Sequence, residues 1–386
     1  MKVLGIMLAK MTLCMIAVSM SATAADRGTF ITSPTPHGDQ RWRIGYYEGG
    51  EYIDYQKVLM ETVRGLMKLG WVERAEIPEQ QGEQTHQLWK WLAANAKSDY
   101  IEFVADAHYS GNWDEATRER TITIMLDRLN GKGDIDLMIA MGTLAGKDLA
   151  SDRHKTPTMV LSASDPISAG IVASVEDSGH EHVHAWVDPF RFERQIKVFH
   201  DIIGFQTLGV AYEDTVSGRS YAAIETIEKL SKERRFKIER CYTQSDISDS
   251  DIAEKSVLAC FERFAKSVDA VYVTQQGGVN QRSIPDLARI ANAHHIPTFS
   301  QAGSEEVKYG FLASLSQAGF KYVGEFHATT IAKVFNGARP NQLDQLFEEP
   351  PKIAINLETA EIIGFVPPLL LLGAADEIYQ EIALPQ

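Results

Sequence analysis

The chain has 386 residues, of which 44% are hydrophobic and 23% are charged, a balance typical of a globular protein and not of a disordered one. Its formal net charge of −14 repels polyanions, which argues against nucleic acid and anionic membranes as partners. At about 150 residues per domain, the length allows two domains of ordinary size.

The N-terminus has the pattern of a secretory signal peptide. Lys2 and Lys10 flank or interrupt an apolar stretch that continues through Met11–Met20 and ends in the small-residue sequence Ala22-Thr23-Ala24. A membrane-spanning helix needs about 20 uninterrupted apolar residues, and Lys10 breaks this run. We therefore predict that residues 1–24 are a cleaved signal peptide and that the mature protein is periplasmic or secreted.

Two cysteines follow the predicted signal peptide, Cys241 and Cys260. An oxidising compartment permits a disulfide between them. A bridge also requires their Cα atoms to lie within about 7 Å of each other, which the sequence does not fix. A disulfide and two free thiols therefore both remain open.

From Arg41 onward, short apolar runs alternate with segments whose hydrophobic residues recur every three or four positions. The short runs predict strands at 43–47, 100–105, 136–141, 158–163, 208–212, 238–242, 270–273 and 297–299. The periodic segments predict helices at 58–69, 84–96, 122–129, 190–203, 222–234, 252–267 and 284–294. Residues 25–40 contain Pro34, Pro36 and Gly38 and predict a flexible leader into the fold.

Strands that alternate with helices indicate an α/β fold with parallel sheets and helices on both faces. The chain contains two such runs, joined near residues 180–190, which predicts two lobes. Ligands of open α/β sheets bind beyond the carboxyl ends of the strands. Two lobes that face each other through these ends would enclose a cleft.

Five segments, taken in order, resemble the periplasmic substrate-binding proteins of ABC transporters, in the family that includes tryptophan- and tyrosine-binding members. These segments are Asp136–Ala145, Pro157–Val172, Tyr309–Ser314, Phe335–Pro340 and Ile355–Ala360. The resemblance extends from about Arg43 to Ile378 and implies a type I periplasmic-binding fold, with two Rossmann-like lobes joined by a three-stranded hinge. It places residues 41–183 and 311–345 in the first lobe, and residues 184–310 and 346–386 in the second.

Three loops of the first lobe supply candidate ligand-binding residues. The resemblance implies that the loop after the first strand lines the pocket, with Tyr47, Glu48 and Tyr52, although a plain turn with half-buried tyrosines fits the same sequence. Gly142, Thr143 and Leu144 open a helix directly after a buried strand. Its free N–H groups suit a ligand carboxylate; the alternative is an N-cap threonine.

The third loop carries Ser164 and Asp165 at the same rim. Asp165 is suited to accept hydrogen bonds from a ligand amine or hydroxyl. A turn in which the Asp165 carboxylate bonds its own backbone ahead of Pro166 is the alternative.

In the second lobe, Gln275 and Gln276 follow a predicted strand and face the cleft. The resemblance implies an acidic residue where Gln276 stands, paired with a ligand ammonium, and a neutral amide cannot supply that charge. Aromatic amino acids are therefore weaker candidates than the family suggests. Tyr212 and Ser300 complete this edge, and Glu213 or Asp214 would restore a negative charge if either pointed inward.

His180, His182 and His184 alternate along the chain and would share one face of a strand, as zinc or copper ligands do. A solvated histidine cluster is the more ordinary interpretation, so we predict no metal and no cofactor. The sequence also contains no nucleophile elbow, phosphate-binding glycine loop or zinc-protease helix, which indicates a protein that is not an enzyme.

Together these features predict a monomeric periplasmic protein that captures a small organic ligand, such as an amino acid or another carboxylate, by closure of two lobes. The closed form would dock on the membrane permease of an ABC transporter. The alternative is a ligand-sensing subunit of a membrane histidine kinase or cyclase, because the same fold also serves that role.

Overall fold

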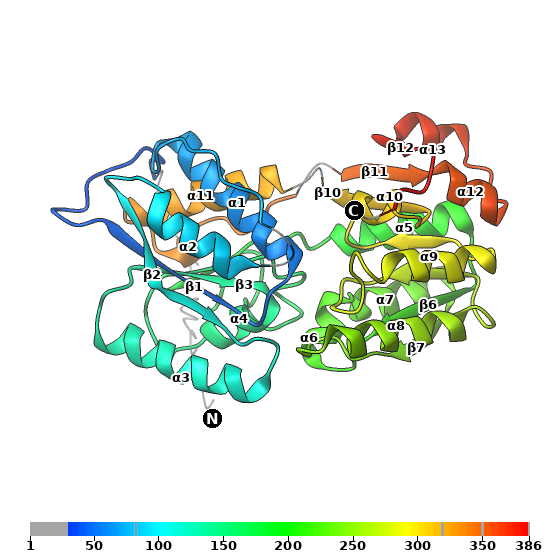
Figure 1. Cartoon of the computed structure of the whole chain (residues 1–386), viewed down its shortest axis with the longest axis horizontal. Coiled ribbons are helices and arrows are strands. Elements are labelled where there is room, and N and C mark those ends of the chain that lie inside the picture. The colour runs from blue at the N-terminus through cyan, green and yellow to red at the C-terminus, as the bar shows by residue number, and fades with distance from the viewer. Residues whose placement is uncertain (1–29, 81, 83, 318–319, 349–350, 385–386) are drawn as a thin grey trace, which may run out of the picture.

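The computed structural model describes residues 30–80, 82, 84–317, 320–348 and 351–384. Two sheets, each covered by helices on both faces, form two lobes that lie side by side (Figure 1). The α/β fold predicted from the sequence, with two lobes of mainly parallel strands, is confirmed. The predicted signal peptide lies outside the described residues.

The first lobe contains a five-stranded parallel sheet of order β2-β1-β3-β4-β5. Its strands are β1 Trp42–Glu48, β2 Ile101–Ser110, β3 Leu137–Met141, β4 Thr158–Leu161 and β5 Val183–Ala185. Its helices are α1 Ile53–Leu69, α2 Thr85–Asn95, α3 Glu115–Gly131, α4 Gly142–Leu149 and α11 Lys321–Phe335. Helices α1, α2 and α11 cover one face of the sheet, and α3 and α4 cover the other.

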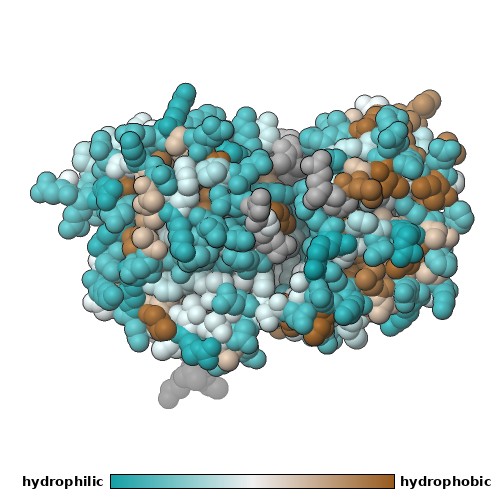
Figure 2. All heavy atoms as spheres, viewed as in Figure 1, coloured by the Kyte–Doolittle hydropathy of each residue, from teal (hydrophilic) through white to brown (hydrophobic). Residues whose placement is uncertain are grey.

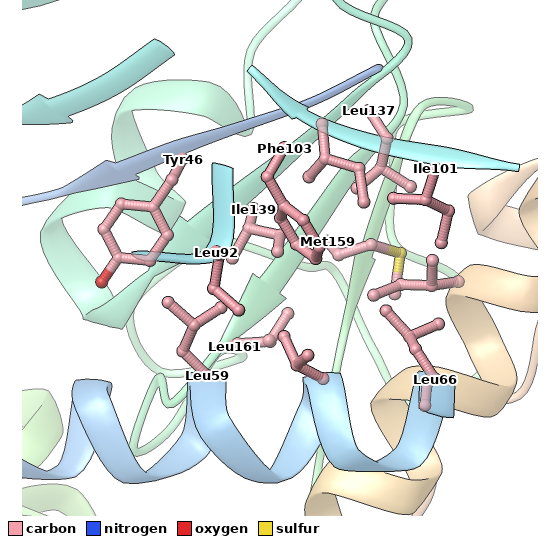
Figure 3. Close-up of a cluster of buried hydrophobic side chains, with 14 of the residues drawn as sticks. Tyr46, Leu59, Leu66, Leu92, Ile101, Phe103, Leu137, Ile139, Met159 and Leu161 are labelled. Atoms are coloured by element: carbon pink, nitrogen blue, oxygen red, sulfur yellow. The ribbon is translucent and has the colours of Figure 1, made fainter. Parts of the chain in front are cut away.

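The central strands of this sheet are apolar on both faces, which explains their uninterrupted hydrophobic sequence. Leu137 and Ile139 of β3 point toward α1, where they meet Leu59 and Leu66 in a single buried cluster (Figure 3). Met138, between them, points to the opposite face. Because side chains alternate along a strand, β3 contributes to the hydrophobic cores on both faces of the sheet.

The second lobe contains a seven-stranded sheet of order β12-β11-β10-β9-β8-β6-β7, in which β10 and β11 are antiparallel and the other pairs are parallel. Its strands are β6 Thr207–Tyr212, β7 Lys237–Tyr242, β8 Ala270–Val273, β9 Thr298–Ser300, β10 Ala313–Gln317, β11 Pro351–Asn356 and β12 Glu377–Tyr379. Its helices are α5 Arg191–Ile203, α6 Val216–Tyr221, α7 Ile224–Arg234, α8 Ser250–Phe264, α9 Ile284–Ala293, α10 Ser304–Lys308, α12 Leu357–Ile363 and α13 Leu369–Ala374.

The chain passes between the lobes three times, as the resemblance implied: between β5 and α5, between β10 and α11, and between the short helix η1 (Pro340–Gln342) and β11. The first and third crossings pair with each other. The Val187 N–H donates to the Gln345 carbonyl at 2.8 Å, and the Trp186 indole N–H donates to the Phe347 carbonyl at 2.9 Å. These bonds form a hinge that fixes how the two lobes can rotate.

The division between the lobes differs from the predicted one in two places. Strand β10 was assigned to the first lobe within residues 311–345, but it pairs with β9 and β11 and belongs to the second sheet. The return to the first lobe therefore comes after β10, at α11. Residues 184 and 185 belong to β5 of the first sheet, because they pair with β4.

The described part of the predicted flexible leader is held against the first lobe. The Trp71 indole N–H donates to the Thr32 carbonyl at 2.7 Å, and the Asn336 side-chain amide donates to the Ile31 carbonyl at 2.8 Å. His37 stacks on Trp42 with ring centroids 3.6 Å apart. Proline and glycine therefore mark an ordered extended segment here.

The visible surface is mostly hydrophilic, and hydrophobic residues gather at the outer end of the second lobe, near α13 (Figure 2). Leu369, Leu370 and the nearby Val366 are each at least 86% exposed. Among the described residues, no helix is long and apolar enough to cross a bilayer.

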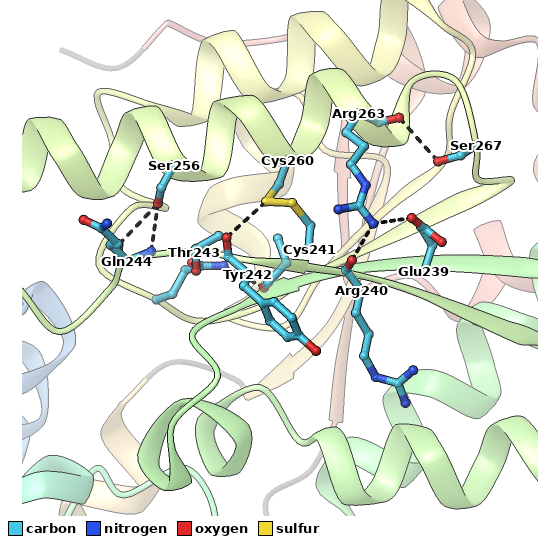
Figure 4. The surroundings of a disulfide bond; sticks show 12 residues. Glu239, Arg240, Cys241, Tyr242, Thr243, Gln244, Ser256, Cys260, Arg263 and Ser267 are labelled. Carbon is cyan, nitrogen blue, oxygen red and sulfur yellow. Dashed lines mark hydrogen bonds and ion pairs between the residues drawn. A yellow bond between two sulfur atoms is a disulfide. The ribbon is translucent and has the colours of Figure 1, made fainter.

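A disulfide joins Cys241 of β7 to Cys260 of α8, with their Cα atoms 5.6 Å apart (Figure 4). Strand β7 is an edge strand with one neighbour in the sheet, β6, so the bridge ties it to the helix that covers it. Arg263 of α8 reinforces this connection by donating to the Arg240 carbonyl at 2.7 Å. The two alternatives left by the sequence are resolved in favour of the disulfide.

We expect the double variant Cys241→Ala/Cys260→Ala to lose about 3 kcal/mol of stability, because a bridge that closes a loop of this length restricts the unfolded chain by about that amount. The measurement is thermal unfolding followed by circular dichroism. A reductant should lower the Tm of the wild-type protein and leave that of the double variant unchanged. Equal Tm values for the oxidised wild type and the variant would contradict the stabilising role.

Candidate ligand-binding cleft

A cleft of about 560 Å³ lies between the lobes and is lined by residues from both. This volume falls within the range of small-molecule sites, about 300–1,000 Å³. The first lobe contributes the start of α1, the loop after β2, the start of α4 and the loop after β4. The second contributes the loops after β7, β8 and β9. All but one of these segments directly follow the carboxyl ends of strands, and α1 follows β1 after a short loop, as expected for α/β sheets.

The lobes touch each other around the cleft. Lys57 of α1 and Glu305 of α10 form an ion pair at 2.8 Å, and the Ser168 hydroxyl donates to the Glu225 carboxylate at 3.0 Å. The Gln275 amide of the second lobe reaches across to Asp54 of α1 at 3.4 Å. The structure therefore shows the lobes in a closed arrangement.

Half of the ligand-binding candidates from the sequence line the cleft. They are Tyr52, Thr143, Leu144, Ser164, Gln275 and Gln276. Ser164 and Gln275 come from opposite lobes, and the hydroxyl of one lies 3.5 Å from the amide oxygen of the other. The Thr143 hydroxyl forms no side-chain hydrogen bond with the described residues, which leaves it available to a ligand.

Three first-lobe candidates serve the framework and do not line the cleft. Tyr47 points to the far face of the sheet, where its hydroxyl donates to Asp148 at 2.7 Å. Gly142 has φ +84°, and a Cβ there would lie 1.9 Å from the Tyr55 hydroxyl oxygen, so this glycine makes room for Tyr55. The Asp165 carboxylate accepts a hydrogen bond from the Ser168 N–H at 2.9 Å. Asp165 thus forms the side-chain-to-backbone turn that was the alternative to ligand binding.

Two second-lobe candidates also lie outside the cleft lining. Tyr212 is fully buried and packs edge-on against Tyr242 with ring centroids 5.5 Å apart. The Ser300 hydroxyl donates to the Glu306 carboxylate at 2.6 Å and accepts from the Gly303 N–H at 2.9 Å. Ser300 therefore stabilises the conformation of the loop after β9 and does not line the cleft.

The Gln276 side chain is fully engaged by its own lobe. Its amide oxygen accepts from the Thr243 hydroxyl at 2.6 Å, and its amide nitrogen donates to the Ala211 carbonyl at 2.8 Å and to Thr274 at 2.9 Å. These bonds anchor the loop after β8. Gln276 therefore stabilises the cleft wall, and its side chain has no free polar group for a ligand.

Aromatic side chains that the sequence did not single out form much of the cleft wall. They are Tyr55, Trp113, Trp186, Tyr221, Tyr309 and Phe320. Trp113 is held at φ +52°, a conformation rare for a bulky residue, and its indole N–H donates to the Glu51 carbonyl at 2.9 Å. A Cβ at Gly50 would lie 2.4 Å from the Trp113 ring, so this glycine makes room for Trp113.

Carboxylates that the sequence did not single out also face the cleft. Asp246, in the loop after β7, has its pKa raised to about 7 by burial and, next, by the charge of Glu213. Burial also raises the pKa of Asp54, although Lys57 and Arg191 oppose this shift. Asp246 lies in the loop that follows β7, so the strand-end rule applied to the strand predicted at 238–242 points to this loop.

Glu48, the remaining candidate, is buried beneath the cleft and does not line it. Its carboxylate accepts from the Tyr46 hydroxyl at 2.8 Å and from the Thr85 hydroxyl at 2.7 Å. Burial raises the pKa of Glu48 to about 7 in spite of these bonds. Among the described residues, no cation forms an ion pair with Glu48.

We expect Glu48→Gln to alter how stability depends on pH. The Glu48 pKa is about 7 in the folded protein against an ordinary 4.5, so between these values the folded state holds more protons and stability falls as pH rises. The amide does not titrate and still accepts both hydrogen bonds. The variant should therefore gain up to about 3 kcal/mol relative to wild type from pH 4.5 to 7. Denaturant titrations across this range measure the difference, and a constant difference would contradict the account.

Of the three histidines, His180 and His182 lie with ring centroids 5.8 Å apart, whereas His184 contacts other partners. The His184 Nε2–H donates to the Asp344 carbonyl at 2.9 Å, and its ring lies beside Phe326. His182 packs edge-on against His154 with ring centroids 4.7 Å apart. Within the described ranges, no group of three or more His, Cys, Asp or Glu residues is placed to hold a metal ion. The interpretation of this segment as a metal site has no support in the structure.

The fold and the cleft define a two-lobed binding protein with the type I periplasmic-binding architecture. The family model described as ABC transporter substrate binding protein matches residues 101–378, well over half of the chain. The chain therefore belongs to the family of ABC transporter substrate-binding proteins.

Solved structures with 17–18% sequence identity share this fold. A conserved domain protein from Vibrio cholerae has a TM-score of 0.64, with 88% of this chain and 100% of that chain covered. An ABC domain from Streptococcus pneumoniae, in complex with L-Trp, has a TM-score of 0.62 with coverages of 87% and 99%. A ligand-free, open substrate-binding protein with adhesive properties from Clostridium difficile has a TM-score of 0.57 with coverages of 88% and 100%. No curated protein sequence matches the chain significantly.

Proposed function

We propose that the protein is a periplasmic solute-binding protein that captures a small organic ligand in the interlobe cleft and delivers it to the permease of an ABC transporter. One observation carries this proposal: a cleft of about 560 Å³, lined by the strand ends of both lobes, lies beside a hinge of three crossings. Membership of the substrate-binding family supports the transporter as the partner.

Capture follows from the position of the cleft residues on both sides of the hinge. A ligand that contacts Thr143 and Ser164 from the first lobe and Gln275 from the second favours the closed arrangement, because it makes these contacts together only when the lobes are closed. Trp186 belongs to the first crossing and also lines the cleft, so the ligand contacts the hinge itself. Closure thereby reports occupancy to the permease.

The setting and mode of action are part of the same proposal. The predicted signal peptide and the Cys241–Cys260 disulfide both suit an oxidising compartment outside the cytoplasm. The cleft is complete within one chain, which fits action as a monomer. We infer that the protein works by binding alone, since its family is one of binding proteins.

Aromatic solutes are the ligands we propose to test first. Tyrosine and tryptophan side chains offer flat apolar faces on which a ring can stack, and Tyr52, Tyr55 and Trp113 gather on the first-lobe side of the cleft. The relative from S. pneumoniae is described in complex with L-Trp, which makes amino acids with aromatic rings a reasonable starting set.

We expect a ligand identified by thermal shift to lose its effect in Thr143→Trp, because the indole fills the cleft beside the start of α4. The screen covers amino acids, amines, purines and small carboxylates, and the variant's own Tm should stay within a few degrees of wild type. Thr123→Trp, on the exposed side of α3, is the matched control and should keep the full shift. An undiminished shift in Thr143→Trp would place the ligand elsewhere, and no shift with any solute would count against solute capture.

A further inference from the structure

We propose, resting on the proposed function, that the captured solute carries a positively charged amine, and that Asp246 binds this group between Tyr55 and Tyr221. Asp246 and Tyr221 belong to the second lobe and Tyr55 to the first, and all three line the cleft. The amine would thus bridge the two lobes.

The charge balance of the cleft favours a cationic solute. Six carboxylate side chains line the cleft against three cationic ones. Two of the cations are already paired with cleft carboxylates: Lys57 with Glu305, and Lys352 with Glu377. Burial raises the pKa of Glu306 to about 8, so this carboxyl group is largely neutral at pH 7. The other cleft carboxylates still outnumber the cations, which favours a cationic solute over an anionic one.

Asp246 lacks a counter-ion among the described residues. Asp54 has Lys57 and Arg191 close enough to lower its pKa, whereas no residue in the described part of the chain forms an ion pair with Asp246. The charge that acts most strongly on Asp246 is another carboxylate, Glu213, which accepts from the Asp246 backbone N–H at 3.3 Å. Asp246 therefore has no cation partner within the described ranges, as is also true of Glu51 and Glu306. Of these three acids, Asp246 is the one that stands beside Tyr55 and Tyr221.

Arg118 is the one cation that acts on Asp246, and it is committed elsewhere. Its guanidinium donates two hydrogen bonds to Asp148, one of them at 2.8 Å, on the far side of the first sheet. The Asp246 carboxylate accepts a long hydrogen bond from the Ser245 hydroxyl at 3.4 Å, which does not balance its charge. A half-buried carboxylate without a counter-ion is costly to ionise. A ligand ammonium would remove this cost on binding, so part of the binding energy is available only to a cation.

Aromatic side chains surround Asp246 in the cleft. Burial and, next, the charge of Asp246 raise the pKa of Tyr55, which shows that the carboxylate acts on this hydroxyl from the opposite lobe. The Tyr221 hydroxyl is buried in the cleft wall and forms no hydrogen bond with the described residues, so an ammonium N–H can donate to it. Aromatic faces beside a carboxylate suit an organic cation.

The position of Asp246 also accounts for Gln276. The loops after β7 and β8 are joined by hydrogen bonds from Thr243 to Gln276 at 2.6 Å and from the Gly277 N–H to the Ser245 hydroxyl at 2.9 Å. Asp246 follows Ser245, so the acid stands in the loop beside the residue where the resemblance places one. A binding site for an amine therefore does not require an acid at Gln276.

The test uses two probes that share an indole ring and differ in charge: tryptamine, a cation, and indole-3-propionate, an anion. Isothermal titration on the wild-type protein should give tighter binding of tryptamine by at least tenfold. Asp246→Asn should weaken tryptamine binding at least tenfold, the range measured for loss of a charged hydrogen bond. Asp214→Asn removes a charge from the exposed loop after β6, outside the cleft lining, and should change the affinity by no more than about twofold.

The pH dependence of tryptamine binding supplies a readout that a structural role of Asp246 would not produce. Since the Asp246 pKa is about 7 without ligand, affinity should rise from pH 6 to 8 as this carboxyl ionises, and should be lost as pH falls. The groups that act on or near it are Glu213, Tyr55, Tyr221 and Arg118. Glu213→Gln removes the repelling charge and should move the midpoint to lower pH.

Three outcomes overturn the inference. Equal or tighter binding of indole-3-propionate, an unchanged affinity in Asp246→Asn, or a solute screen whose binders are all neutral or anionic would each show that the amine site is wrong while solute capture stands. If neither the probes nor any screened solute binds, both the amine site and the proposed function fail.

Discussion

The two-lobed architecture depends on the packing of α11 against α1. A Cβ added at Gly65 of α1 would lie 2.6 Å from the Ala328 Cβ, and one added at Gly324 of α11 would lie 2.5 Å from the Glu61 carbonyl carbon. The backbones of the two helices therefore approach as closely as glycine allows. Because α11 comes from late in the sequence and lies on the first lobe, the chain has to cross between the lobes three times (Figure 1). The hinge is a consequence of this contact.

Closure of the two lobes also buries a carboxylate, Asp246, that has no counter-ion among the described residues. Closing the lobes brings Tyr55 of one lobe toward Asp246 of the other and removes the carboxylate from bulk water, which raises its pKa. Without a bound solute, ionising Asp246 in the closed cleft costs desolvation free energy. A cationic solute lowers that cost and so stabilises the closed arrangement. Ion pairs at the rim such as Lys57–Glu305 are partly exposed and contribute only modestly to closure. Occupancy thus shifts the balance between open and closed forms.

The sequence was sufficient for the fold and for the part of the site that follows directly from strand ends. Hydrophobic period located most of the strands and helices between residues 42 and 300, and the strand-end rule placed Thr143, Leu144, Ser164 and Gln275 on the cleft. Hydrophobic period did not locate β5, the late strands β10–β12 or helix α11. The strand-end rule failed where side-chain direction decides the outcome: Tyr47 lies on the far face of β1, and the Gln276 amide turns back into its own lobe. Trp113 was beyond sequence reasoning, because its place depends on a left-handed backbone and on the two glycines of another loop. The lobe of β10 depends on strand pairing, which local pattern does not encode.

The most direct test of the central claim, that the lobes close on a solute, is the distance between them with and without that solute. Spin labels on cysteines introduced at Glu119 in α3 and Lys232 in α7, both exposed, report this distance by pulsed electron paramagnetic resonance. For any solute that raises the Tm, we predict that saturation replaces a broad, longer distribution with a single narrow, shorter one. A solute that binds at saturation and leaves the distance distribution unchanged would contradict capture by closure.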